Sequence, residues 1–119
     1  MSQTIHNEKH MSSHFFLGID IGTYSSKGVI TDDKGKVVAS ASVPHELSIP
    51  HPGYAEHDAE QTWWHDFVVL CQQLLKESGI DPKNIKAIGH SAISPALVCI
   101  GAEGEPLMPA ILYQYFRHF

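Results

Sequence analysis

The sequence has little cysteine, and this absence excludes two kinds of small domain. Only two of its 119 residues are cysteines, Cys71 and Cys99, and they form no Cys-x-x-Cys pair. A disulfide framework and a cysteine-based zinc site are therefore both excluded. Each cysteine lies in an apolar run, which predicts buried free thiols in a reducing, cytoplasmic setting.

Clustered positive charge and long apolar runs are also missing. Eight Lys and Arg residues against thirteen Asp and Glu residues give a net charge of -5, and the basic residues are scattered. A nucleic-acid surface needs clustered Lys and Arg, so no nucleic-acid partner is expected. No apolar stretch approaches the ~18 residues of a membrane helix. Residues 1–14 are polar and lack the apolar core of a signal peptide, so we expect a disordered leader there and no membrane contact.

The length of the chain suits one small domain, and its sequence has several strand patterns. Apolar runs bounded by turn residues predict strands over residues 15–20, 27–32 and 37–43, joined by tight turns into an antiparallel meander. A loop rich in proline follows over residues 44–54. Two further strands are predicted over residues 85–89 and 96–100. The resulting order, three strands, a helix and two strands, begins a mixed sheet with a helix on its face.

The predicted helix has clear end signals. Asp58 can cap its start, with Gln61 three residues on as in a capping box, and Gly79 stands where a helix ends. The nearby carboxylates of Glu56 and Glu60 are read as helix-start and surface charges rather than as a catalytic pair. Apolar residues at helical spacing form one stripe, so we expect packing against the core rather than sugar stacking by the tryptophans. The stripe consists of Trp63, Trp64, Phe67, Val68, Cys71, Leu74 and Leu75.

The segment between the first two predicted strands combines a carboxylate, hydrogen-bond donors and a cation. Asp20 ends the first strand, Gly22 lets the backbone turn sharply, and Lys27 begins the returning strand. Hydroxyl groups and exposed backbone N–H groups come from Thr23, Tyr24, Ser25 and Ser26. Such donors bind phosphate oxygens, a lysine offsets their charge, and a carboxylate holds Mg²⁺ through its waters. The segment is neither a Walker loop nor a Rossmann fingerprint, and the residues alone leave a plain Ser/Thr-rich hairpin as an alternative.

Three segments in order carry a family resemblance. The pattern Asp-x-Gly-Thr-x-x-x-Lys over residues 20–27 resembles the first phosphate motif of the actin, Hsp70 and sugar kinase superfamily. Residues 51–64 (HPGYAEHDAEQTWW) resemble the Pro-Gly-x-x-Glu-x-Asp-x-x-x-x-Trp stretch of FGGY carbohydrate kinases. Residues 85–91 and 104–113 resemble a strand of that family and its Gly-x-Pro-x-x-Pro-Ala-Ile-Leu segment. Residues 15–113 thus resemble the N-terminal part of the first domain of an FGGY kinase.

The resemblance implies a fold and an activity. The fold is α/β and ribonuclease H-like (actin-like ATPase), incomplete here: a three-stranded antiparallel meander, one long helix, then two further strands. The activity is ATP-dependent phosphorylation of a sugar or polyol hydroxyl, of the pentulose type, with ATP and Mg²⁺ as cofactors. Asp20 is implied as the magnesium-linked carboxylate, and the full-length parent as a candidate homodimer. The phosphate side is implied to be Gly22, Thr23, Tyr24, Ser25 and Lys27.

The turn over residues 90–95 faces the sugar in this family. Many members carry polar side chains where this chain has Ile93-Ser94-Pro95. Ser91 and Ser94 are the remaining polar candidates for the substrate, and the alternative is an ordinary connecting loop.

The last residues depart from the family pattern. An Asp-x-Arg element is implied after Tyr113, but residues 114–119 read QYFRHF, which we expect to be a tail unrelated to the family. The general-base Asp and the adenine-binding domain are expected beyond the end of this chain, so the chain is predicted to be inactive alone. Two alternatives stay open: a non-catalytic truncated remnant or interaction module, and another actin-like-superfamily ATPase, which should lack the Pro-Gly…Trp segment.

Overall fold

The first three strands form the antiparallel meander that the sequence predicts. The computed structural model describes residues 13–114 and 116, so most of the expected leader (1–14) and tail (114–119) lies outside the described residues. Strands β1 (Phe15–Ile21), β2 (Ser25–Asp32) and β3 (Val37–Pro44) pair in sequence order. Gly35 lies in the β2–β3 turn with φ +81°, the left-handed conformation that favours glycine.

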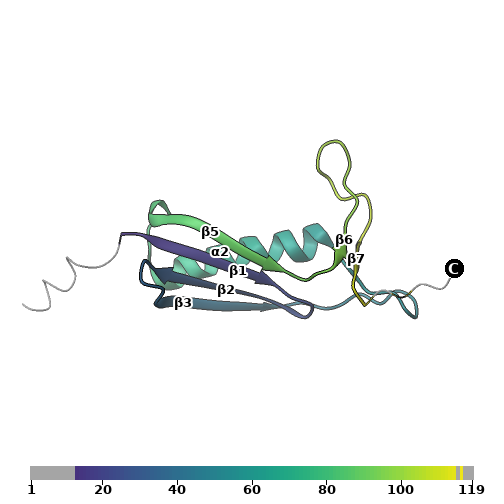
Figure 1. Cartoon of the computed structure of the whole chain (residues 1–119), viewed down its shortest axis with the longest axis horizontal. Helices are drawn as coiled ribbons and strands as arrows, with labels where there is room; N and C mark the ends of the chain where they lie inside the picture. Colours follow the sequence, from purple (N-terminus) through teal and green to yellow (C-terminus); the bar gives the residue numbers. More distant parts are fainter. Residues whose placement is uncertain (1–12, 115, 117–119) are drawn as a thin grey trace, which may run out of the picture.

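The helical segment also begins at Asp58 and ends at Gly79, as the capping residues in the sequence predict. The side chain of Asp58 accepts hydrogen bonds from the backbone N–H groups of Glu60 and Gln61. The first turns are a π-helix, η1 (Ala59–Trp64), which continues as α2 (His65–Ser78). Gly79 ends α2 in the left-handed conformation, with φ +68°. A 3₁₀ turn, η2 (Pro82–Asn84), then leads into β5 (Ile85–Ala92), which runs parallel to β1 and gives the sheet order β3-β2-β1-β5 (Figure 1).

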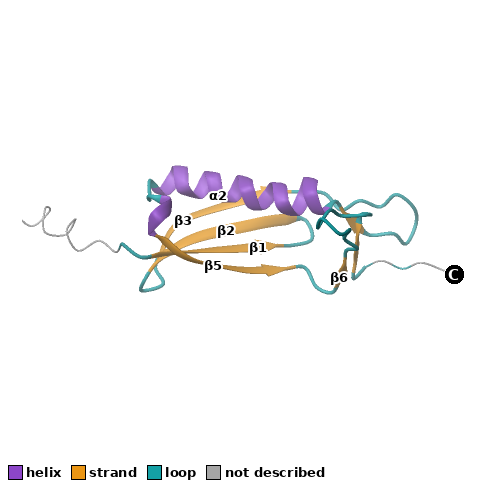
Figure 2. Ribbon diagram, turned by 90° about the horizontal axis from the view of Figure 1, so that it is seen from above, coloured by secondary structure: helices purple, strands orange, loops and turns teal. Residues whose placement is uncertain are grey.

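Helix α2 covers one face of this sheet (Figure 2). The covered face and the helix share a core that consists of Phe15, Leu17, Ile19, Ile30, Leu70 and Leu74. Within residues 13–114 and 116, no element covers the opposite face, which we call the open face. The predicted stripe needs one correction: Trp64 is 63% exposed and stacks on Phe67, because the buried positions of α2 follow a four-residue spacing from Asp66.

The predicted strand over residues 96–100 is wrong in length and in partner. Only β6 (Ala96–Leu97) forms, and it pairs with β7 (Ala110–Leu112) in a second small sheet of order β4-β7-β6. Neither β7 nor β4 (Glu56–His57) was predicted, because such short strands carry no readable alternation and their pairing is long-range. Residues 90–92, predicted as a turn, instead continue β5.

Two features of the structure test the predictions made from the lack of long apolar runs and from the low cysteine content. No helix in the described part of the chain is long and apolar enough to cross a bilayer. Both cysteines are free, as predicted, but only Cys71 is partly buried, and burial raises the pKa of its thiol. Cys99 is exposed, which corrects the expectation that both thiols are buried.

Candidate functional site

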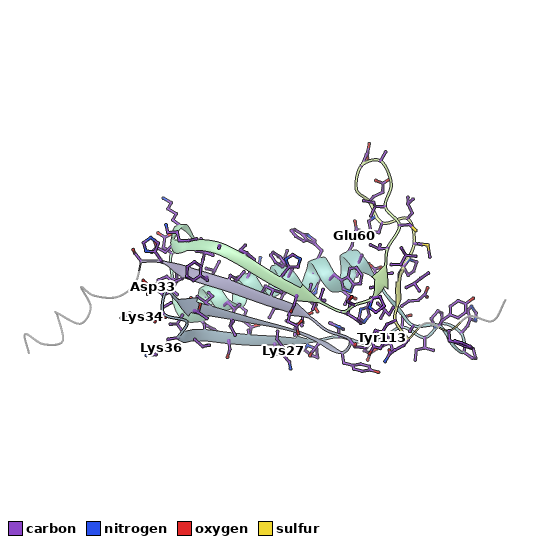
Figure 3. All side chains as sticks on the ribbon, viewed as in Figure 1. Lys27, Asp33, Lys34, Lys36, Glu60 and Tyr113 are labelled. Atoms are coloured by element: carbon purple, nitrogen blue, oxygen red, sulfur yellow. The ribbon has the colours of Figure 1, made fainter. Side chains whose placement is uncertain are left out.

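A row of polar side chains crosses the open face of the main sheet. Asp20 on β1 pairs with Lys27 on β2 and with Ser91 on β5. Directly paired residues place their side chains on the same face of a sheet. The Ser91 hydroxyl donates to Oδ1 of Asp20 at 2.6 Å, so the predicted magnesium carboxylate and one predicted substrate residue are in contact. Figure 3 shows Lys27 well away from Lys34 and Lys36, which lie at the opposite end of the sheet.

These side chains border a hollow of about 370 Å³ on the sheet. Glycine occupies two paired positions on neighbouring strands there, Gly18 on β1 and Gly89 on β5, so no side chain rises from the floor at these two positions. Among the residues that the structure describes, Asp20 is the only carboxylate that lines the hollow. The described residues contain no group of three or more His, Cys, Asp or Glu side chains that could hold a metal ion. A single exposed carboxylate nevertheless fits Mg²⁺, which dehydrates reluctantly and keeps several waters.

The turn between β1 and β2 is as tight as the sequence predicts. The N–H of Gly22 donates to the carbonyl oxygen of Ser25 at 2.9 Å. A Cβ atom at Gly22 would lie 2.9 Å from that oxygen, so close backbone approach, rather than a positive φ, requires glycine here. Tyr24 is exposed, and Thr23 and Ser25 are half-buried. The turn therefore presents the predicted phosphate-side residues beside Lys27.

Ser26 does not belong to this group, which corrects one expected hydroxyl. Its side chain lies on the covered face, is 0% exposed, and donates to Oδ2 of Asp66 at 2.7 Å. Ser94 is exposed in the loop after β5 and does not line the hollow. The structure thus brings Ser91, but not Ser94, to Asp20.

Two histidines that sequence reasoning missed bind the carbonyl groups of the turn. His45, which follows β3, donates through Nε2 to the carbonyl oxygen of Gly22 at 2.8 Å. His57, on β4, donates through Nε2 to the carbonyl oxygen of Thr23 at 3.0 Å. The two rings meet edge to face, with centroids 4.9 Å apart. Both histidines are therefore bonded to the turn itself.

Each histidine is held in turn by the helical segment. Nδ1 of His45 lies 2.7 Å from Oδ2 of the buried Asp66 on α2. Nδ1 of His57 accepts a hydrogen bond from the Trp63 indole at 3.1 Å, and an indole can only donate, so the proton of neutral His57 sits on Nε2. Burial, followed by the neighbouring His45, lowers the pKa of His57 below its ordinary value.

Ser26, His45 and Asp66 are not a hydrolytic triad, although the three residue types meet. In such a triad the serine bonds to the distal nitrogen of the histidine and faces the substrate. Here Ser26 is fully buried and bonds to the carboxylate, and Nε2 of His45 is occupied by a backbone carbonyl. One signal could have revealed Asp66: it shares the four-residue spacing of Leu70 and Leu74, and a carboxylate on a buried helix face needs a polar partner.

Comparison with known proteins assigns the family. A family model described as the FGGY family of carbohydrate kinases, N-terminal domain, matches residues 15–118 and so runs past Tyr113, where the resemblance was expected to end. A glycerol kinase from Marinomonas sp. is 33% identical over 103 residues, which is 86% of this chain and 21% of that protein.

Solved structures give the same assignment. A xylulose kinase from Rhodospirillum rubrum superposes with a TM-score of 0.77 at 32% identity, over 87% of this chain and 21% of that one. A Plasmodium falciparum glycerol kinase, solved with ADP, superposes with a TM-score of 0.76 at 26% identity, over 89% and 21%. The chain therefore spans about a fifth of the length of these relatives. Its fold is that of the actin-like ATPase sugar kinases, and the chain belongs to the FGGY family of carbohydrate kinases, matching its N-terminal domain.

Proposed function

We propose that this chain supplies the phosphate side of an active site that transfers phosphate from ATP to a sugar or polyol hydroxyl. The observation that carries the proposal is the row across the open face: Asp20 bonded to Ser91 and paired with Lys27, beside the turn over residues 22–25. Membership of a carbohydrate kinase family supports the reaction class. The relative solved with ADP supports an adenine nucleotide as the phosphate donor.

Each group in the row suits one task in phosphoryl transfer, which depends mainly on positioning and charge stabilisation. The Lys27 ammonium offsets phosphate charge, and the turn offers backbone N–H groups and the hydroxyls of Thr23 and Ser25. Asp20 would hold Mg²⁺ through its waters, and Ser91 fixes one oxygen of that carboxylate. Bound Mg²⁺ would neutralise phosphate charge during transfer.

For the acceptor we propose a pentulose or a related polyol, since the relatives are named xylulose kinase and glycerol kinase. Ser91 and Ser94 remain our candidates for the acceptor side. In the described part of the chain, Asp20 is the sole carboxylate of the hollow, and we already propose it for magnesium. The hollow therefore offers no second carboxylate to take the proton of the acceptor hydroxyl, so we expect the 119-residue chain to bind magnesium polyphosphate without phosphorylating a sugar.

Substitution of Lys27 tests the phosphate assignment. We expect Lys27→Met to weaken binding of magnesium ATP to the chain about 10-fold or more, because a charge-assisted hydrogen bond to phosphate contributes ~1.5–3 kcal/mol. Isothermal titration calorimetry at fixed ionic strength measures the change. Lys34→Met is the matched control, since it removes the same charge at the far end of the sheet. Equal weakening in both variants would mean that net charge, not the site, governs binding.

A turnover assay tests the second part. The purified 119-residue chain is incubated with ATP, Mg²⁺ and a panel of pentuloses, hexoses, glycerol and other polyols, and sugar phosphate is quantified. We expect none above the buffer blank. Robust product from the chain alone would show that it already holds a complete site. Reading the DNA after codon 119 then distinguishes a frameshifted kinase, in which a second reading frame resumes with the Asp-x-Arg element and the rest of the kinase, from a remnant.

A further inference from the structure

The turn that faces the hollow is held from behind by two hydrogen bonds. The carbonyl groups of Gly22 and Thr23 both point inward, to Nε2 of His45 and Nε2 of His57. Neither histidine lines the hollow. His57 is 1% exposed, and the His45 side chain is 6% exposed. Any influence of these histidines on a ligand therefore passes through the turn.

Peptide geometry connects these carbonyl groups to the outer surface of the turn. A peptide unit is planar and trans, so its C=O and N–H groups point in opposite directions. Fixing the Gly22 carbonyl toward His45 therefore aims the N–H of Thr23 outward, and fixing the Thr23 carbonyl toward His57 does the same for Tyr24. Within residues 13–114 and 116, neither N–H donates to a backbone carbonyl. Successive N–H groups that converge in this way form a concavity that binds anions.

We propose that His45 and His57 are positioning residues that aim the Thr23 and Tyr24 N–H groups at an anionic oxygen, such as a phosphate oxygen of a nucleotide. The inference rests on the proposed function for the identity of the anion. It assigns a role to two side chains that touch no ligand themselves.

The two histidines are themselves held rigidly enough to perform this role. His57 is fixed by the Trp63 indole and His45 by the Asp66 carboxylate. Asp66 also accepts from Ser26, so β2, the segment after β3 and α2 meet at one carboxylate. Both ring nitrogens of His45 face oxygen atoms, one of the Asp66 carboxyl group and one of the Gly22 carbonyl group. The position of the turn is thus fixed through side-chain bonds to the helical segment.

The test separates hydrogen bonding from simple packing by restoring the donor. His57→Leu keeps an apolar side chain at the position but removes the N–H, whereas the amide nitrogen of Gln in His57→Gln can replace Nε2 as donor. Isotope-labelled 119-residue chain is studied by NMR, which reports the carbonyl ¹³C shifts of Gly22 and Thr23. The amide shifts of Thr23 and Tyr24 are then followed during titration with magnesium tripolyphosphate. His51→Leu, in the proline-rich loop, is the control.

We expect the Thr23 and Tyr24 amide signals of the wild-type chain to shift on titration. In His57→Leu the ¹³C shift of the Thr23 carbonyl should be smaller than in wild type, and the affinity for tripolyphosphate should be about 3–10-fold weaker, as loss of one neutral hydrogen bond predicts. His57→Gln should recover most of both effects, and His51→Leu should match wild type. Trp63→Phe, which keeps an aromatic ring but removes the bond to Nδ1, should be intermediate. It also serves if His57→Leu fails to fold.

Three results would overturn the inference. His57→Leu could keep the wild-type carbonyl shift and an affinity within twofold, or His57→Gln could be as weak as His57→Leu, which would indicate packing alone. A wild-type chain whose Thr23 and Tyr24 amides ignore tripolyphosphate would refute the anion-donor role. Failure of the kinase proposal looks different: the amides would respond to tripolyphosphate, but ATP would not bind in a Lys27-dependent manner.

Discussion

At the scale of single residues, the turn beside the hollow depends on the buried side chain of Asp66, which holds His45. It is 2% exposed, yet it accepts from Ser26 and lies against His45, so its burial is compensated by hydrogen bonds. Within the described residues, no buried side-chain nitrogen or oxygen lacks a partner. Removing one member of a buried pair leaves an uncompensated group and typically costs ~3–5 kcal/mol. The conformation of the turn is therefore tied to the stability of the domain.

The pH dependence of stability follows from His57. Burial and the neighbouring His45 lower the pKa of folded His57 below its ordinary value of 6.5, while the other charged group that faces it, Asp66, acts in the opposite direction. Above pH 6.5 both states are neutral at this residue and its full contribution is present. As the pH falls below 6.5, the unfolded chain takes up a proton that the folded chain resists, so the free energy of unfolding decreases until the folded pKa is reached.

We therefore expect the wild-type chain to lose more stability between pH 7.5 and pH 5.5 than His57→Gln does. Urea unfolding at the two pH values, taken as a difference between the two proteins, cancels the contributions of the other histidines. An identical pH dependence in both proteins would contradict the assignment of a neutral His57.

At the scale of elements, the sequence predicted those helices and strands that form through contacts between residues close in the chain. The meander follows from tight turns and apolar runs, and the helix follows from Asp58, its apolar spacing and Gly79, because capping is decided within a few residues. The second sheet could not be predicted in this way. Its strands are two or three residues long, and β4 pairs with β7 across more than fifty residues of chain.

The helix start offers an element-scale prediction. Asp58→Ala should lower the free energy of unfolding by about 1 kcal/mol, since two backbone N–H groups lose their acceptor. Asp58→Ser should recover most of it, because a serine oxygen can cap the same groups. Chemical denaturation measures both variants. If serine were as destabilising as alanine, the contribution of Asp58 would come from its charge and not from the cap.

The difference between local and long-range contacts also explains which site residues could be predicted. Asp20 and Lys27 stand seven residues apart on one hairpin, so their pairing can be derived from the turn between them. Ser91 reaches Asp20 only because β5 extends further than its sequence pattern indicated. His45 and His57 were missed because their partners, Gly22 and Thr23, are backbone groups more than twenty residues away, and no side-chain pattern encodes such a contact.

At the scale of the whole molecule, the described residues cover the sheet on one side only. β5 is an edge strand, Phe16 is exposed on the open face, and Ile88 borders a groove beside α2. Uncovered apolar surface and a free strand edge favour association and reduce stability.

We expect the isolated 119-residue chain to bind a hydrophobic dye, to self-associate with rising concentration, and to unfold over a broad temperature range. Sedimentation velocity and differential scanning calorimetry measure association and cooperativity. A monomer with a sharp, concentration-independent transition would show that the uncovered surface carries no such penalty.

The pairing of β4 with β7 also bears on the order in which parts of the chain can fold during synthesis. His57 lies opposite Ala110 in this pair, and the N–H of Leu112 donates to the carbonyl oxygen of Ala55. On a ribosome that adds about 5–20 residues per second, β7 emerges roughly 3–11 s after His57. The β1–β2 hairpin can form at once, but β4, which carries the His57 bond to its turn, gains its β7 partner only later. The earliest hairpin of the chain is therefore supported by a strand pair that is completed among the last.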